Sequence, residues 1–157
     1  MKKQRWFPYV IGILIAEAVG GLSALLTHSA MDNFSQTVQQ PPLSPPMVLF
    51  PIVWSILYAL MGIGATRIWL APASADRIKS LNIYVAQLII NFFWSLIFFN
   101  AGAYGFALFW LIALWLLVVW MILFFRKVDP LAAWLQVPYL LWLTFAAYLN
   151  AGIGLLN

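Results

Sequence analysis

The sequence predicts an all-α membrane protein: a single domain, residues 1–157, formed by a bundle of five transmembrane helices. Of its 157 residues, 65% are hydrophobic and 8% are charged, whereas a soluble domain has roughly 45–50% apolar and about 25% charged residues. Too few charges remain to cover a water-soluble surface. Five apolar stretches and a one-sided distribution of basic residues complete the prediction.

The five predicted spans cover residues 7–26, 47–70, 81–99, 104–125 and 131–150. Each holds roughly 20 mostly apolar residues, which is the length that an α-helix needs to cross the hydrocarbon core. The first span is too long for the apolar region of a signal peptide, so we expect it to be retained. The connections are short except for residues 27–46, a polar segment with four prolines, which we expect to form a long loop.

The basic residues predict the orientation. With five spans, all of them fall on one side of the membrane: Lys2, Lys3, Arg5, Arg67, Arg77, Lys79, Arg126 and Lys127. Basic residues stay in the cytoplasm during insertion. We therefore expect a multi-pass protein of a bacterial-type cytoplasmic membrane, with the N-terminus inside and the long first loop outside. The net charge of +4 is then a signal of topology, and we expect no nucleic-acid partner.

The first span combines small residues with an acid. Gly12, Ala16, Gly20 and Ala24 recur every four residues, a pattern that lets two helix backbones approach closely. It favours packing within the bundle over dimerisation. Glu17 lies beside this stripe near mid-membrane, where an ionisable group costs a few kcal/mol unless it is protonated or paired. Glu17 is therefore either a functional acid or a neutral side chain bonded to a neighbouring helix, and its role stays open.

Aromatic and amide side chains recur at helical spacing in the other spans. They are Trp54, Tyr58 and Met61 in the second span, Tyr84, Gln87, Asn91, Trp94 and Phe98 in the third, and Tyr139, Trp142 and Ala146 in the fifth. Gln87 and Asn91 must face the bundle interior, because lipid offers no hydrogen bonds. They form either interhelical bonds or the polar floor of a pocket. Aromatic walls with a few amides suit a flat, mostly apolar ligand.

Other chemistry lacks candidate residues. The chain has no cysteine and one histidine, His28, which is more typical of a solvated loop residue than of a metal ligand. The sequence has no carboxylate pair, Ser–His–Asp set or glycine-rich phosphate loop. We therefore expect no metal site and neither hydrolytic nor phosphoryl-transfer activity.

Three segments carry a resemblance to a known family. They are QPPLSPP at residues 40–46 with FPIVWSILYALM at 50–61, QLIINFFWS at 87–95, and VPYLLW at 137–142. Taken together, in this order and with five spans, they resemble the signatures of the translocator protein family. It is also called the TspO/MBR, peripheral-type benzodiazepine receptor or tryptophan-rich sensory protein family.

The resemblance implies a five-helix bundle whose first loop, with Pro41, Pro45 and Pro46, forms a lid over a pocket. Family members bind porphyrins such as protoporphyrin IX and haem, many bind sterols or benzodiazepine-type drugs, and they are often homodimers. No cofactor is required, and the porphyrin or haem is the ligand. The ligand-binding residues expected here are Trp54, Tyr58, Gln87, Asn91, Trp94, Tyr139, Trp142 and Ala146.

The predicted function is that of a membrane receptor or carrier for tetrapyrroles, with a role in porphyrin handling or stress regulation. One alternative is an enzyme that degrades porphyrin in light, with Trp54 and Trp142 as its catalytic residues. Another is an assembly or regulatory membrane protein that senses a ligand. No Lys or Arg lies in the membrane interior, so the propionates of a porphyrin should point toward the outer loop or water.

Overall fold

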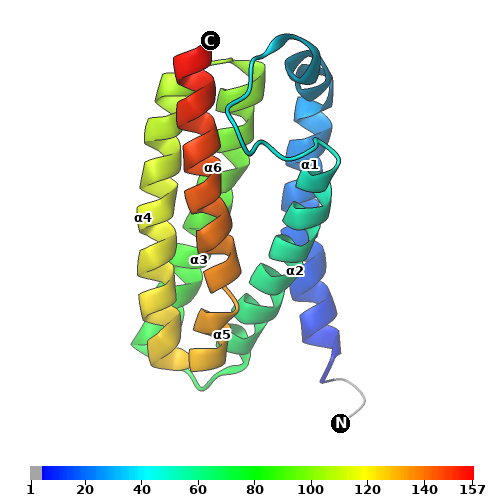
Figure 1. The fold of residues 1–157 in the computed structure, drawn as a ribbon. Helices are drawn as coiled ribbons and strands as arrows, with labels where there is room; N and C mark the ends of the chain where they lie inside the picture. The colour runs from blue at the N-terminus through cyan, green and yellow to red at the C-terminus, as the bar shows by residue number, and fades with distance from the viewer. Residues whose placement is uncertain (1–4) are drawn as a thin grey trace.

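The computed structural model describes residues 5–157, which fold into helices without any strand in that range. The elements are α1 (Phe7–Thr37), α2 (Leu49–Leu70), α3 (Ala75–Ser95), the π-helical turn η2 (Leu96–Asn100), α4 (Tyr104–Val128), α5 (Pro130–Trp134) and α6 (Val137–Leu156) (Figure 1). Lys2 and Lys3, two of the basic residues from which the orientation is predicted, lie outside the described residues.

Five helical segments are long and apolar enough to cross a membrane, which confirms the predicted fold class. The third consists of α3 and η2 together, and the fifth consists of α5 and α6. Large apolar side chains such as Leu25, Phe109 and Leu141 remain exposed on the outside of the bundle. Lipid rather than water is the solvent that such a surface requires.

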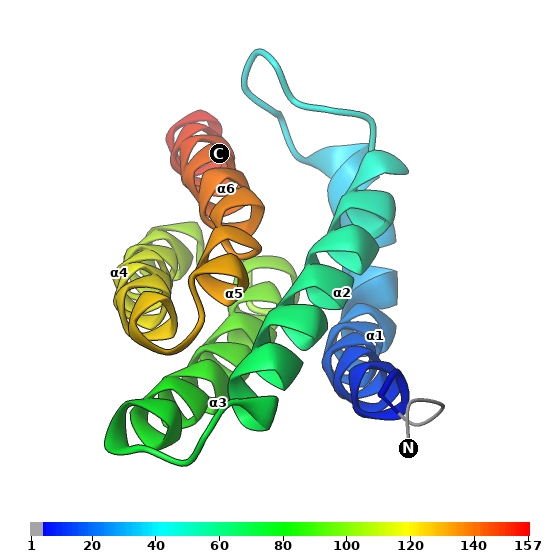
Figure 2. The ribbon, with the colours of Figure 1, turned by 90° about the horizontal axis from the view of Figure 1, so that it is seen from below.

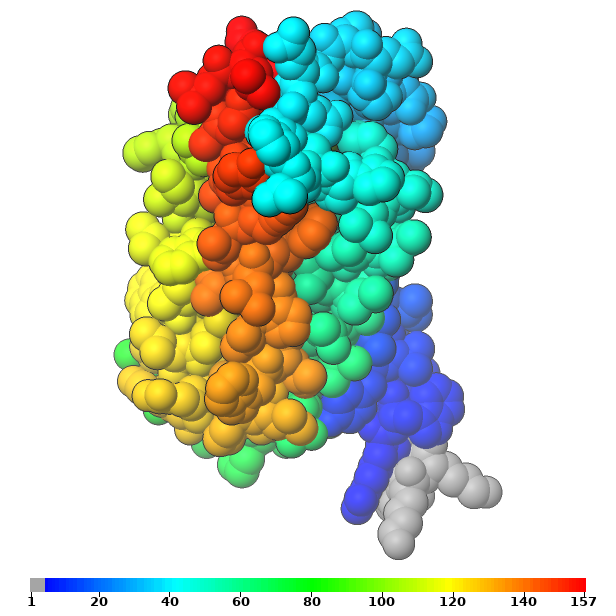
Figure 3. Space-filling model, in the orientation of Figure 1, coloured from blue at the N-terminus to red at the C-terminus, as the bar shows by residue number. Residues whose placement is uncertain are grey.

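The helices are arranged so that α2 leans away from α6 toward one end of the bundle. α1 packs on α2, and α3 and α6 both pack on α4 (Figures 1 and 2). At its C-terminal end α2 lies against α5, whereas its N-terminal end is well separated from α6. The loop of residues 38–48, which we call the lid loop, runs across this separated end (Figure 3).

The first helix is longer than predicted. The predicted span ended at residue 26, but α1 continues to Thr37. The segment from residue 27 to residue 40 contains neither proline nor glycine, so nothing in it interrupts the helix before Pro41. About half of the expected first loop is therefore helical.

The fifth span, predicted over residues 131–150, consists of two helices with a break just before Pro138. α5 and α6 are joined by a turn at Leu135 and Gln136. Pro138 lies in the first turn of α6. Backbone N–H groups in a first turn have no partner within the helix, so the missing N–H of proline costs no hydrogen bond there. The carboxylate of Asp129 accepts a bond from the Leu131 N–H (3.1 Å) and caps α5.

The small-residue stripe of α1 packs within the bundle, as predicted. A Cβ atom placed on Gly62 of α2 would lie 2.6 Å from the Gly12 carbonyl oxygen and 2.7 Å from the Ile13 backbone. Gly20, two turns further along α1, lies directly against the Tyr58 ring. The absence of side chains at Gly12 and Gly62 therefore sets how closely α1 and α2 approach.

The basic side chains of the described residues gather at the end where α1 begins and α2 and α4 end. The Arg67 guanidinium donates to the Asp129 carboxylate over 2.7 Å and ties α2 to α5. Arg77 lies over the Trp69 ring at 5.1 Å, and Lys127 over the Phe124 ring at 4.7 Å. Charges held by aromatic rings and ion pairs in this way suit a membrane–water interface.

The contact between the two helices gives a first prediction. Gly62→Ala should lower the free energy of unfolding by about 1–3 kcal/mol, because the added methyl group meets backbone atoms that cannot move aside. The measurement is the thermal unfolding of the full chain in detergent.

Gly21→Ala is the matched control, since a Cβ atom at Gly21 meets nothing within 4 Å. It should leave the stability unchanged or raise it by about 0.5–1 kcal/mol through helix propensity. Equal melting temperatures for the two variants would show that the α1–α2 approach is not tight.

Candidate functional site

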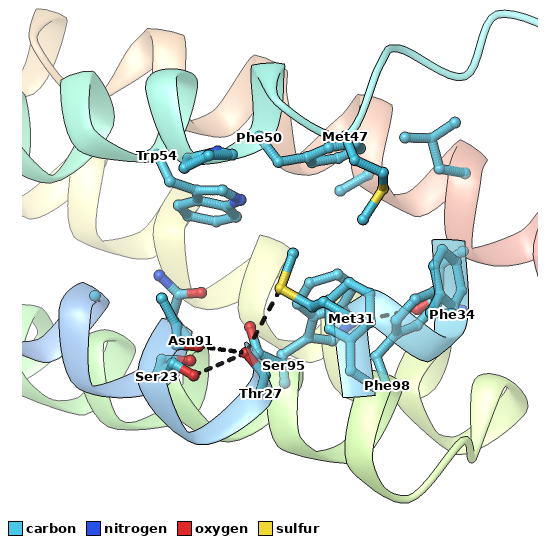
Figure 4. A pocket seen from close by; sticks show the side chains of 18 of the residues that line it. Ser23, Thr27, Met31, Phe34, Met47, Phe50, Trp54, Asn91, Ser95 and Phe98 are labelled. Carbon is cyan, nitrogen blue, oxygen red and sulfur yellow. Dashed lines mark hydrogen bonds between the residues drawn. The ribbon is translucent and has the colours of Figure 1, made fainter. Parts of the chain in front are cut away.

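A cavity of about 260 Å³ lies beneath the lid loop, between α1, α2, α6 and the C-terminal part of α3 with η2 (Figure 4). Its walls are mostly apolar and aromatic. They include Phe34, Met47, Phe50, Trp54, Trp94, Phe98, Phe99 and Trp142, with hydroxyl and amide groups from Ser23, Thr27, Asn91, Ser95 and Asn150.

Two walls face each other across the cavity. Met47 at the end of the lid loop is followed by Phe50 and Trp54 at the start of α2, and Thr27 and Met31 of α1 lie opposite them (Figure 4). The Phe50 ring meets the Trp142 ring of α6 edge-on, with centroids 5.7 Å apart. A flat ring system between these walls would have aromatic or thioether groups on both faces.

Hydrogen bonds between buried side chains fix the inner end of the cavity. The Asn91 amide of α3 donates to the Tyr58 hydroxyl of α2 over 3.1 Å. The Tyr58 ring lies 5.6 Å from the Trp54 ring. Asn91 therefore bonds to a neighbouring helix and also lines the cavity. It combines the two roles that the sequence predicts, an interhelical hydrogen bond and the polar floor of a pocket.

A second group of bonds fixes the wall formed by α3 and α6. The Trp94 indole N–H donates to the Asn150 side-chain oxygen (3.2 Å), and the Asn150 amide donates to the Tyr104 carbonyl (2.9 Å). The Trp94 ring stacks on the Phe98 ring at 5.1 Å. With its N–H already bonded, Trp94 presents an apolar surface to the cavity.

Gln87 and Tyr139 are placed differently from the prediction. Both are fully buried, and the Tyr139 hydroxyl donates to the Gln87 side-chain oxygen over 2.7 Å. Neither residue lines the cavity. Gln87 approaches the Met61 sulfur at 3.8 Å on its other side. These two side chains bond the helices together beneath the cavity, because buried polar groups satisfy each other first.

The structure brings the other predicted ligand residues together around the cavity: Trp54, Tyr58, Asn91, Trp94, Trp142 and Ala146. Sequence reasoning missed the wall formed by the second half of α1, which carries Thr27, Met31 and Phe34. The sequence does contain a signal for the longer helix α1, because no proline or glycine stands between residues 27 and 40.

The prolines of the lid loop shape it without forming most of the cavity wall. Pro41 is buried, and a Cβ atom on Gly152 of α6 would lie 2.7 Å from the Pro41 ring. Pro45 is half-buried and Pro46 is exposed. The loop side chains that line the cavity are Gln40, Ser44 and Met47.

α6 holds the lid loop closed through two further contacts. The Tyr148 hydroxyl donates to the Pro42 carbonyl over 2.7 Å. The Asn157 side chain bonds to Gln39 twice, accepting from its backbone N–H (3.1 Å) and donating to its carbonyl (2.8 Å). The loop contains no helix or strand of its own. Its contacts with α6 and with Asn157 at the end of that helix therefore set its position.

Among the described residues that line the cavity there is no carboxylate, no Lys and no Arg. His28 is the one lining side chain among them that can carry a positive charge. Glu17 lies half-buried on α1, away from this lining. Within residues 5–157, Asp129 forms an ion pair with Arg67 and Asp32 lies 3.7 Å from His28, whereas no ion pair is found for Glu17.

Comparison with known proteins identifies relatives over nearly the whole chain. Residues 12–156 match the profile of the TspO/MBR family. The translocator protein of Bos taurus is 33% identical over 148 residues, which cover 92% of this chain and 87% of that protein. Protein CrtK of Rhodobacter capsulatus is 31% identical over 150 residues, 95% and 92% of the two chains. The tryptophan-rich protein TspO of Chlorobaculum tepidum is 32% identical over 153 residues, 94% and 92%.

The contacts with α6 give a second prediction. Tyr148→Phe removes the bond to the Pro42 carbonyl, so the lid loop should open more often. Its amides should exchange with solvent roughly five- to tenfold faster, as expected for the loss of about 1 kcal/mol. Hydrogen-exchange mass spectrometry of residues 38–48 measures this.

Thr144→Ala, which removes a contact between α6 and Trp115 instead, should leave that exchange unchanged. Equal exchange in both variants would contradict the role of Tyr148.

Proposed function

This chain belongs to the TspO/MBR family of membrane proteins, and we propose that it is a receptor or carrier that binds tetrapyrroles in the cavity under its lid loop. The observation that supports this most strongly is the pair of facing walls, with Trp54 and Phe50 on one side and Met31 on the other. Sterols and benzodiazepine-type drugs are further candidate ligands of the same apolar site.

The shape and chemistry of the cavity favour a flat, largely apolar ligand. Aromatic rings gain from offset stacking and edge contacts with a conjugated macrocycle. The methionine side chains, Met31 and Met47, can adjust to its outline. The hydroxyl and amide groups of Ser23, Thr27 and Asn91 supply a few polar contacts without a buried charge.

The size of the cavity implies that the lid loop moves. A volume of about 260 Å³ is below the roughly 300–1,000 Å³ of pockets for drug-sized ligands. We therefore expect the loop to swing outward from α6 when a macrocycle enters. The contacts made by Tyr148 and Asn157 are the ones that such a movement breaks.

We further propose that the cavity opens on the outer side of a bacterial-type cytoplasmic membrane. The described basic side chains lie at the opposite end, and basic ends stay in the cytoplasm. Pairing of two copies remains a prediction. Gly12 and Gly20 of the stripe already pack against α2, so we expect a dimer surface to use another lipid-facing part of the bundle.

Tetrapyrrole binding gives a third prediction. Trp54→Phe and Trp142→Phe should each weaken protoporphyrin IX binding about two- to tenfold, because each removes part of an aromatic wall worth roughly 0.5–1.5 kcal/mol. The measurement is a fluorescence-quenching titration of the full chain in detergent.

Trp120→Phe is the control, since Trp120 is exposed on the outside of α4 and does not line the cavity. Its titration should match that of the unmodified protein. Unchanged affinity in the Trp54 and Trp142 variants would exclude this cavity as the porphyrin site.

A second candidate function is light-dependent degradation of the bound porphyrin. The specific observation in its favour is that three tryptophans line the cavity and that one of them, Trp54, lies close to two tyrosine rings. The Trp54 centroid lies 5.6 Å from Tyr58 and 6.2 Å from Tyr139. An electron passed from Trp54 to the excited porphyrin would leave a tryptophan radical beside these tyrosine rings and a reduced porphyrin, which dioxygen as the oxidant could then attack.

A fourth prediction tests this activity. If it occurs, light should bleach the absorption bands of bound porphyrin faster than those of free porphyrin. The double variant of Trp54→Phe and Trp142→Phe, loaded to the same occupancy, should lose that excess. Bleaching no faster than that of free porphyrin would eliminate the enzyme function and leave the binding function intact.

A further inference from the structure

The cationic groups of the protein are distributed unevenly with respect to the cavity. Within residues 5–157, every Lys and Arg belongs to the end where α1 begins, far from the lid loop. The cavity lining holds one side chain that can carry a positive charge, His28. It lies on the second half of α1, one helical turn from the cavity residues Ala24 and Met31.

This distribution matters for the proposed ligand because protoporphyrin IX and haem each carry two propionate groups. Burying a carboxylate without a partner costs far more than an aromatic contact returns. The propionates must therefore lie at the rim of the cavity, in reach of water and of any hydrogen-bond donor there. The exposed fraction of the His28 side chain is 77%, so it is both part of the lining and open to solvent.

We propose that His28 is the residue that recognises the carboxylate of the ligand, by donating an imidazole N–H to a propionate at the rim. The proposal rests on the proposed function and narrows it, because it makes the cavity selective for acidic tetrapyrroles over their neutral esters. A hydrogen bond to an ionised acceptor is stronger than one between neutral groups, so a single donor suffices to discriminate between the two ligand forms.

Asp32 opposes this contact. Its carboxylate lies 3.7 Å from Nε2 of His28, one turn further along α1, and its side chain is 68% exposed. That distance is too long for a hydrogen bond, so the imidazole N–H is free to donate to a ligand. The negative charge of Asp32 nevertheless repels a propionate beside it. Removal of this charge should therefore have the opposite effect from removal of His28.

The position of His28 favours contact with the edge of the macrocycle over coordination of a central iron. The ring centre belongs between the facing walls, where Trp54 and Met31 point toward each other (Figure 4). A largely solvent-exposed side chain lies at the rim instead. The propionates, which project from the edge of the ring, reach such a position.

The fifth prediction compares protoporphyrin IX with its dimethyl ester, by fluorescence titration of the full chain in detergent. His28→Ala should weaken binding of the acid roughly five- to tenfold, as expected for a hydrogen bond to a charged group at a partly solvated site. Asp32→Asn should tighten it about twofold by removing a surface repulsion. Neither change should alter the affinity for the ester. Ser29→Ala, an exposed neighbour that does not line the cavity, is the matched control for both ligands.

The outcomes are distinguishable. Equal weakening of acid and ester by His28→Ala, with an unchanged melting temperature, would show that the side chain merely fills space and would overturn the proposal. A parallel titration with haem in which His28→Ala shifts the haem absorption bands, while protoporphyrin IX binding is unchanged, would also overturn it and indicate an iron ligand instead. Failure of both porphyrins to bind the unmodified protein would refute the proposed function itself.

Discussion

The feature on which the rest of the structure depends is the attachment of α2 at one end. Gly62 meets the backbone of α1, and Gly64 lies against the Gln136 side chain at the break between α5 and α6. Gln136 also donates to the Leu60 carbonyl over 3.2 Å. Held by its neighbours at this end, α2 can diverge from α6 at the other, and the cavity occupies the space that results. Close helix packing and an open cavity are thus consequences of the same residues.

The role of a polar side chain within the bundle depends on its distance from the rim of the cavity. Beneath the cavity, Gln87 and Tyr139 use their hydrogen-bonding capacity on each other, as hydrocarbon surroundings require. At the cavity wall, Asn91 and Asn150 each hold an aromatic neighbour in place. At the rim, His28 remains available to a ligand. A ligand therefore meets a surface that is apolar in its interior and polar where it meets water.

The sequence predicts the fold well because its strongest signals, apolar length and small-residue spacing, are local. Trp54, Asn91 and Trp142 could be assigned to a cavity because they lie on the inner faces of three spans. Two features differ from what the local patterns predict. Hydropathy marks where a helix leaves lipid rather than where it ends, so the continuation of α1 to Thr37 was missed. Helical periodicity places Gln87 and Asn91 on one face but does not show which of them reaches the cavity, since that depends on the partner Tyr139.

The lid loop depends on contacts that are distant in sequence, between Gln39 and Asn157 and between Pro42 and Tyr148, so local patterns cannot reveal its closed position. The most direct measurement of the proposed ligand site is an experimental structure of the protein with protoporphyrin IX bound. We expect the macrocycle between Trp54 and Met31, with its propionates at the rim and the lid loop displaced from α6. Protoporphyrin bound on the lipid-facing surface, or at the basic end of the bundle, with the cavity still closed, would contradict this.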